Sequence, residues 1–184
     1  ILVGVEAEGM TACPCAQEMM RERAQVRLLE DGLDENQIER VLDALPMPTH
    51  NQCGRGRLLV TAHPSIRAEQ LARIVEGSMS SETYEILKRP DECFVVNRAH
   101  NNPKFVEDVA RDILGRFVEA YPKLSDDSFV HVRQTNLETI HKHSVFAERT
   151  GWLGDIRREI SDGGSASTPL DLRRYLDLQL QGES

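Results

Sequence analysis

The sequence predicts a mixed α and β fold. Short apolar segments that favour strands alternate along the chain with longer amphipathic segments that have helical spacing. Gly, Pro and Asn stand between most of these segments, where they end helices or open turns. Because helical segments separate most of the strands, this order taken alone favours a parallel sheet. No glycine-rich phosphate loop follows a predicted strand, which argues against a Rossmann or P-loop fold.

Helix start and stop signals define the elements of the first half of the chain. Gly32 is a C-terminal stop for one helix, and Asp34 with Gln37 forms a capping box that opens the next. Pro46 then ends this second helix. The elements expected here are a strand at 1–12 that ends near Met10, helices at 17–31 and from Asp34 to Leu45, a strand at 57–62, and a helix from Ser65 to Met79.

The second half is less regular. Asn102-Pro103 is a good helix start, with Asn as the cap and Pro at the first position, and an apolar stripe continues to about Tyr121. After Gly151 the pattern fades, and residues 161–168 have the composition of a linker. The elements expected here are a helical piece at 81–88, a strand at 93–96, a helix from Asn102, strands near 129–132 and 144–149, and a last helix at 169–180.

Composition excludes several classes of protein. The chain has 184 residues, with 22 Lys and Arg against 30 Asp and Glu, so its net charge is −8. This balance argues against a nucleic-acid binder that neutralises phosphates, although a local basic pocket can still hold one small anion. No apolar run approaches the length of a membrane-spanning helix, so we expect no membrane partner. Four scattered cysteines are typical of free thiols in a reducing compartment, which predicts a cytoplasmic protein.

Four polar segments at loops or element ends carry the candidate chemistry. They are Cys13-Pro14-Cys15, Pro48–Gln52, Lys88–Glu92 and His141-Lys142-His143. Thiolate, imidazole and carboxylate are the ligand set of a zinc or ferrous site. Their spacing matches no structural zinc finger, so a catalytic metal with an open position fits better than a closed site. The alternative is a scatter of surface histidines and buried thiols.

Five further charged residues have two interpretations each. Glu107 is either a solvated glutamate or a carboxylate that accepts two N–H bonds from a ligand. Arg55, Arg57, Lys88 and Arg89 are either phosphate contacts or solvated strand and turn charges.

Five ordered motifs carry a family resemblance. They are Gly9–Cys15, Pro48–Gln52, Tyr84–Glu92, Asn102–Asp108 and Glu138–His143. Together they resemble the metal-dependent GTP cyclohydrolases of the type IB and type IV group, over about residues 3–150. One departure is Cys53, which follows His-Asn-Gln where the family usually has Arg. Arg55 or Arg57 is a possible replacement for that arginine.

The resemblance implies an α+β tunnelling fold, in which an antiparallel sheet with helices packed on one face assembles into an oligomeric barrel. It therefore replaces the parallel sheet as our expectation. Residues 1–150 would be the tunnelling-fold catalytic portion, and 151–184 a linker and C-terminal helix. Family members are longer at the N-terminus, so the chain would correspond to their C-terminal portion. Active sites in this fold lie at subunit contacts, which implies a homo-oligomer, either a dimer or a tetramer.

The resemblance also implies roles for individual residues. The metal-site positions correspond to Cys13, His50, Glu92 and His141. One divalent metal is implied for each site, with iron(II) favoured and zinc or manganese as alternatives. Catalytic roles fall on Cys13, Cys15 and His143. Substrate roles fall on Glu107 for guanine and on Lys88 and Arg89 for phosphate. The choice between Cys13 and Cys15 as ligand, and between His141 and His143, stays open.

The spacing of the first two motifs separates two branches of the family. Here 32 residues, Ala16–Met47, stand between Cys15 and Pro48. This long connection resembles the archaeal type IV branch, which converts GTP to 7,8-dihydroneopterin 2′,3′-cyclic phosphate in the methanopterin pathway. The alternative is the type IB reaction, which makes 7,8-dihydroneopterin triphosphate for folate or queuosine pathways. A second alternative is a non-catalytic purine- or pterin-binding protein of the same fold.

Overall fold

A computed structural model of the chain describes residues 1–163 and 170–182. Within these residues, five strands form one antiparallel sheet in the order β3-β1-β2-β4-β5. The strands are β1 Leu2–Ala12, β2 Asn51–Thr61, β3 Ser81–Glu82, β4 Phe129–Leu137 and β5 Val145–Trp152. The helices are α1 Pro14–Glu30, α2 Glu35–Ala44, α3 Ala68–Ser78, α4 Arg89–His100, α5 Val106–Ala120, α6 Leu153–Asp162 and α7 Leu172–Gly182. The α+β class with an antiparallel sheet is therefore confirmed, and the parallel order is wrong.

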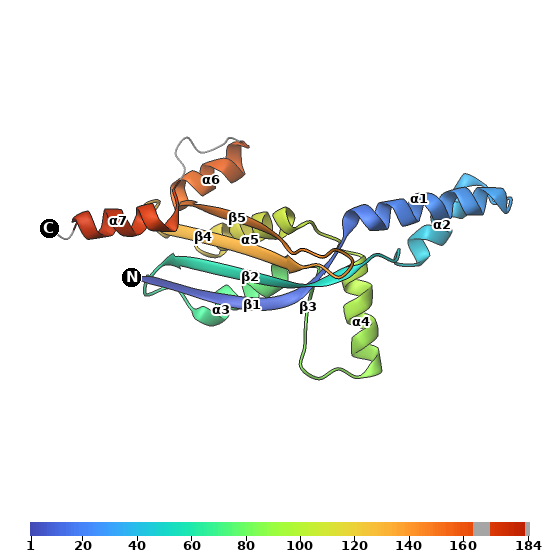
Figure 1. The fold of residues 1–184 in the computed structure, drawn as a ribbon, viewed down its shortest axis with the longest axis horizontal. Helices are drawn as coiled ribbons and strands as arrows, with labels where there is room; N and C mark the ends of the chain where they lie inside the picture. Colours follow the sequence, from blue (N-terminus) through green and yellow to red (C-terminus); the bar gives the residue numbers. More distant parts are fainter. Residues whose placement is uncertain (164–169, 183–184) are drawn as a thin grey trace.

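The connection between β1 and β2 explains why the parallel interpretation is wrong. Helices α1 and α2 form a hairpin that projects from one end of the sheet and brings the chain back to that end (Figure 1). Because the chain re-enters where it left, β2 must run back along β1, with Gly9 opposite Gly54. A parallel pair would need a connection that crosses the sheet. The predicted capping box between Asp34 and Gln37 is present at the start of α2.

The main core lies between the sheet and two helices, α3 and α5, on one of its faces. Strand residues alternate between faces, so Leu58 and Val60 of β2 and Val132 of β4 point toward these helices. The largest core side chains are fully buried; they include Leu58, Leu71, Met79, Ile113 and Phe117.

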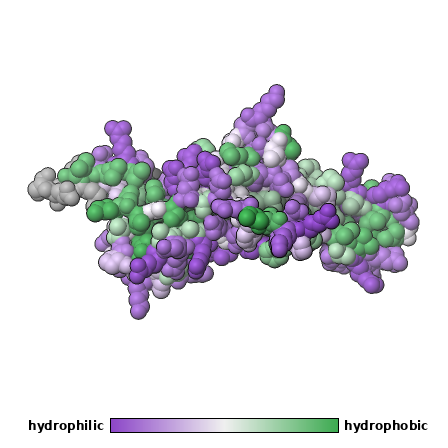
Figure 2. All heavy atoms as spheres, turned by 90° about the horizontal axis from the view of Figure 1, so that it is seen from below, coloured by the Kyte–Doolittle hydropathy of each residue, from purple (hydrophilic) through white to green (hydrophobic). Residues whose placement is uncertain are grey.

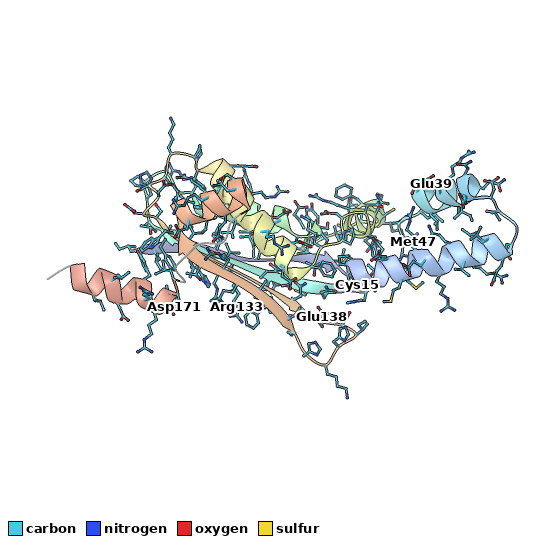
Figure 3. All side chains as sticks on the ribbon, turned by 90° about the horizontal axis from the view of Figure 1, so that it is seen from above. Cys15, Glu39, Met47, Arg133, Glu138 and Asp171 are labelled. Atoms are coloured by element: carbon cyan, nitrogen blue, oxygen red, sulfur yellow. The ribbon has the colours of Figure 1, made fainter. Side chains whose placement is uncertain are left out.

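The other face of the sheet is polar along most of its length. Arg55 pairs with Glu8 and Arg57 with Glu6, each at 2.7 Å. At one end of this face α7 lies on the side of the sheet opposite α5 and α6 (Figure 3). The ring of Tyr175 stacks on Phe129 there, with the ring centroids 4.3 Å apart.

Several predicted elements need correction. The helical piece at 81–88 is wrong, because Ser81–Glu82 form β3 and the following residues are not helical. The strand at 93–96 is also wrong, because this segment lies inside α4, whose first turn holds Pro90 and two acidic residues that favour a helix N-terminus. Helix α6 was not expected. Of the predicted linker, 161–162 belong to α6, and 164–168 lie outside the described residues.

The α1–α2 hairpin stands apart from the core. No residue of α1 is buried, and apolar side chains gather at this end of the molecule (Figure 2). The exposed apolar residues of the hairpin are Met19, Met20, Val26, Leu29, Val41 and Leu45. Among the helices that the structure describes, none is long and apolar enough to cross a membrane.

Candidate metal and substrate pocket

Cys13 is held at the junction of β1 and α1. Its backbone N–H donates to the His50 carbonyl at 3.1 Å, and the Thr49 hydroxyl donates to the Cys13 carbonyl at 2.7 Å. Pro14 then begins α1, so the chain turns sharply after the strand. These contacts bring two predicted motifs, Cys13–Cys15 and Pro48–Gln52, side by side.

His50 lies at the start of β2 and Glu138 directly after the end of β4, as the paired strands require. Cys53 is opposite Leu137 in the register, so the residues just beyond the pairing meet at this end of the sheet. His50 Nδ1 is 3.8 Å from Glu138 Oε2, and both side chains are largely buried. Neither of these two atoms makes a hydrogen bond within the described part of the chain. Figure 3 shows Glu138 at this end of the sheet.

The loop between β4 and β5 completes the cluster. Its Thr139 hydroxyl donates to the Asn51 carbonyl at 2.9 Å, which ties the loop to the start of β2. The His141 ring lies 6.0 Å from the His50 ring and stacks at 5.3 Å on the exposed ring of His143. Ligand atoms of His50, Glu138 and His141 all lie within 4.8 Å of one another.

Glu107 reaches the pocket from the first turn of α5. The predicted start at Asn102-Pro103 is early: α5 begins at Val106, and the Asn102 side chain instead donates to the carbonyls of Met79 and Ser80. The Lys104 backbone N–H donates to the Ala12 carbonyl at 3.0 Å, which holds this segment against the end of β1. The Lys104 ammonium group binds the Ser78 carbonyl and Asp112.

These segments enclose a pocket of about 270 Å³. Its wall includes a thiol, three imidazoles, two carboxylates and two amides, which are Cys13, His50, His141, His143, Glu107, Glu138, Gln52 and Asn136. The structure thus brings together five of the residues to which the sequence assigned roles, namely Cys13, His50, Glu107, His141 and His143.

The other four predicted site residues do not line the pocket as the structure describes it. Cys15 is exposed in the first turn of α1, where Figure 3 labels it. Glu92 and Arg89 are exposed on α4, and Lys88 precedes that helix. Their roles stay predictions.

The residue that follows the His-Asn-Gln motif points away from this pocket. Cys53 and the two arginines after it, Arg55 and Arg57, alternate onto the polar face of the sheet, where both arginines are paired with glutamates. Burial, reinforced by the charge of Glu8, raises the pKa of the Cys53 thiol. A protonated thiol is a poor ligand and nucleophile.

Four polar residues of the pocket received no role from the sequence: Glu138, Gln52, Asn136 and Lys104. Glu138 and Gln52 stood inside motifs, but only the pairing of β2 with β4 places them beside His50. A signal was present in the spacing of Glu138 and His141, since a carboxylate three residues from a histidine in one loop is a possible pair of ligands.

The buried atoms of His50 and Glu138 that make no hydrogen bond within the described residues fit a divalent metal. Two polar atoms buried without a partner are costly, and a cation near both, with His141 as a third ligand, satisfies them together. Imidazole and carboxylate suit iron(II), zinc and manganese.

Comparison with known proteins identifies the family. The model of a family described as type I GTP cyclohydrolase folE2 matches residues 1–147. The chain belongs to this family. Its match spans strands β1 to β4, the first residues of β5, helices α1 to α5 and all the residues that line the pocket.

Proteins named GTP cyclohydrolase MptA are similar to the chain. The one from Methanothermobacter thermautotrophicus is 49% identical over 169 residues, which cover 91% of this chain and 53% of that protein. The one from Methanosarcina mazei is 48% identical over 87% of this chain and 51% of that protein. The one from Methanococcus vannielii is 45% identical over 86% of this chain and 52% of that protein. The chain thus spans about half the length of these curated relatives.

Proposed function

We propose that this chain forms the metal site and the guanine pocket of a GTP cyclohydrolase. The observation that carries the proposal is the gathering of His50, Glu138 and His141 beside Cys13 and Glu107 in one pocket. The names of the relatives support GTP as the substrate. The reaction opens the purine ring at C8, releases formate and recloses the ring with ribose carbons to make a pterin.

The proposed metal is one divalent ion for each site, with iron(II) favoured. His50, Glu138 and His141 would hold it, and Cys13 on the same wall offers a thiolate as a further ligand. A divalent metal bound there supplies the polarisation that makes water a nucleophile near neutral pH. Glu92 is the carboxylate that the family resemblance assigns to this role, and it would have to reach the pocket from α4.

The protein's own residues orient the base and move protons. Glu107 would accept the N1–H and the exocyclic amine of guanine, a pair of donors that adenine lacks on that edge. His143 stacks on His141 but is exposed, so its ring can exchange protons with solvent and carry one to a ring nitrogen of the substrate. Cys15, one residue beyond Pro14, would assist Cys13.

The α1–α2 hairpin supports one product over another. It makes up most of the 32-residue connection Ala16–Met47 that resembles the type IV branch. We therefore propose 7,8-dihydroneopterin 2′,3′-cyclic phosphate as the product, with release of pyrophosphate. The description of the matching family as type I favours the alternative product, 7,8-dihydroneopterin triphosphate.

A homo-oligomer, either a dimer or a tetramer, is the proposed assembly, with its sites at subunit contacts. The pocket is open to one side, and three predicted site residues, Lys88, Arg89 and Glu92, are exposed around α4. These cations and this carboxylate are free to act in a neighbouring subunit's pocket, where Lys88 and Arg89 would bind phosphate.

The test is anaerobic reconstitution of the full-length protein with iron(II), zinc or manganese, followed by GTP turnover and product mass. We expect metal-dependent release of formate and the mass of the cyclic phosphate. The mass of the triphosphate would assign the type IB reaction instead. Tight GTP binding without turnover under every metal would identify a non-catalytic purine-binding protein.

A further inference from the structure

Two amide side chains of β4 form a buried pair, of which Asn136 lines the pocket. Gln134 is fully buried and Asn136 is 2% exposed, and both point toward the helix-covered side of the sheet. Gln134 Nε2 donates to Asn136 Oδ1 at 3.0 Å. Gly54 faces Asn136 on β2, and a Cβ on that glycine would lie 2.7 Å from Gln134 Nε2. The pair therefore depends on the missing side chain at Gly54.

This hydrogen bond orients the Asn136 amide. Because Oδ1 accepts from Gln134, the other end of the Asn136 amide is the donor Nδ2. Asn136 lines the pocket together with Glu107, and within the described residues its Nδ2 makes no hydrogen bond. The wall of the pocket thus carries an oriented and unused N–H donor.

Among the other possible donors on the pocket wall, the Gln52 amide has no hydrogen bond at its buried Oε1 within the described residues to orient it, and the imidazoles of His50 and His141 belong to the metal cluster. Glu107 only accepts, and the ammonium group of Lys104 is already bound to Asp112 and the Ser78 carbonyl. On the guanine edge that Glu107 would read, the C6 carbonyl oxygen lies next to N1–H and is an acceptor. A donor that lines the same pocket as a carboxylate can complement that edge.

We propose that Asn136 is a further substrate-binding residue, which donates through Nδ2 to the C6 carbonyl oxygen of the purine, and that Gln134 is the positioning residue that orients it. The inference rests on the proposed function, because it takes GTP as the substrate. Glu107 would accept hydrogen bonds from N1–H and the exocyclic amine. Asn136 adds a hydrogen bond to the C6 carbonyl oxygen, which lies on the other side of N1–H from the amine.

The test is discrimination between GTP and 6-thio-GTP by the metal-loaded full-length protein. The thio analogue keeps N1–H and the exocyclic amine, so Glu107 should read both nucleotides alike, but sulfur accepts hydrogen bonds weakly. In a competition assay we expect the wild type to favour GTP about tenfold in kcat/KM, which corresponds to about 1.4 kcal/mol. In Asn136→Leu, which has a similar volume and no donor, the ratio should fall to within about twofold of one.

Three more variants keep the result specific. Asn136→Ala should lose the same discrimination and replaces the Leu variant if that protein does not fold. Gln134→Leu should lower the ratio by a smaller factor, because Asn136 stays in place without its orienting bond. Thr11→Val is the matched control: Thr11 is a fully buried polar residue with an unpaired hydroxyl that does not line the pocket, so the ratio should stay at the wild-type value.

The outcomes separate the two proposals. Wild-type protein that turns over neither nucleotide would overturn the proposed function, and this inference with it. Wild-type protein that uses GTP, with Asn136 variants that keep the full preference for GTP over the thio analogue, would overturn the inference alone. Equal loss of discrimination in Thr11→Val would also overturn it, because the effect would then follow from any change in the buried layer.

Discussion

Strands β2 and β4 are each divided into an apolar half and a polar half, and the two halves do different things. Toward one end, Leu58 pairs with Val132 in the register, and both are fully buried in the core. Toward the other end, Gly54 pairs with Asn136, and the strands lead to His50 and Glu138, whose buried atoms lack partners. One continuous pair of strands therefore contributes core packing at one end and leads to metal-binding groups at the other.

The difference between the halves is a difference in what their burial costs. Burying Leu58 or Val132 is favourable, since each removes apolar surface from water. Burying His50 Nδ1 or Glu138 Oε2 without a partner is unfavourable unless a ligand satisfies them. Changes in the apolar half should therefore lower stability, whereas changes in the polar half should lower activity or metal binding with little loss of fold.

The largest expected effect is at Cys13. Cys13→Ala should abolish metal-dependent turnover and leave the fold intact, because the residue is held by backbone bonds rather than by its sulfur. Formate release measures the turnover, and the circular dichroism spectrum measures the fold. Cys15→Ala is the comparison variant, and we expect it to retain more activity. Equal loss in both would make both sulfurs necessary for turnover, and full activity of Cys13→Ala would remove this thiol from the mechanism.

The opposite behaviour is expected at Leu58. Leu58→Ala should lower the free energy of unfolding by about 2–5 kcal/mol, because it leaves a cavity in a fully buried site. Denaturant titration measures this loss. The folded fraction should still bind metal in the wild-type ratio. If metal binding were lost at denaturant concentrations below those that unfold the protein, the apolar half of the strand would contribute to metal binding as well as to stability.

A third prediction concerns the carboxylate of the metal cluster. Glu138→Gln should weaken metal binding by about tenfold or more, since it removes a charged ligand and leaves its shape. Metal content after dialysis against a chelator is the measurement. Glu92→Gln is the control, and a loss of metal there equal to that in Glu138→Gln would show that α4 brings its carboxylate to the site in the assembled protein.

The fourth prediction concerns the guanine contact. Glu107→Gln replaces one acceptor oxygen by a donor that would face N1–H or the amine of the base. We expect a loss of about 10- to 100-fold in kcat/KM, which corresponds to about 1.4–2.8 kcal/mol, with unchanged metal content. Normal kinetics with GTP would make Glu107 a solvated residue of α5.

The same division explains how much could be predicted from the sequence. The strand signals at 57–62 and 129–132 identified only the apolar halves, whereas the strands extend over Asn51–Thr61 and Phe129–Leu137. The polar halves contain Gly, Arg, Gln and Asn, which have no apolar alternation. Their strand structure comes from pairing with β1 and β5 rather than from local propensity.

The site could be predicted in part for a related reason. Motif residues identified Cys13, His50, His141 and Glu107, because they stand at element ends with recognisable chemistry. The amides of β4 carry no such signal, and only the register places Asn136 in the pocket wall. The strand predicted at 93–96 was wrong for the opposite reason. Its apolar residues favour a strand locally, but the residues before it start a helix that includes them.

The smallest expected effect is at His131, the buried titratable residue of the apolar half of β4. Its ring contacts the Thr150 hydroxyl at 2.9 Å, and burial lowers its pKa below the ordinary value of 6.5, against the charge of Glu148 and with help from Arg57 and Arg133. His131 therefore binds a proton more weakly in the folded chain than in the unfolded chain. The free energy of unfolding should therefore fall as pH drops below about 6.5, by at most about 1.4 kcal/mol for each pH unit.

His131→Gln isolates this contribution, because Gln keeps a hydrogen-bonding group toward Thr150 and does not titrate. Denaturant titrations of the wild type and the variant between pH 5 and pH 8 should give curves that run parallel above pH 7 and diverge below it, with the wild type losing stability faster. Parallel curves over the whole range would mean that the imidazole takes up its proton as readily in the fold as in the unfolded chain. The acid sensitivity of the fold would then come from groups other than His131.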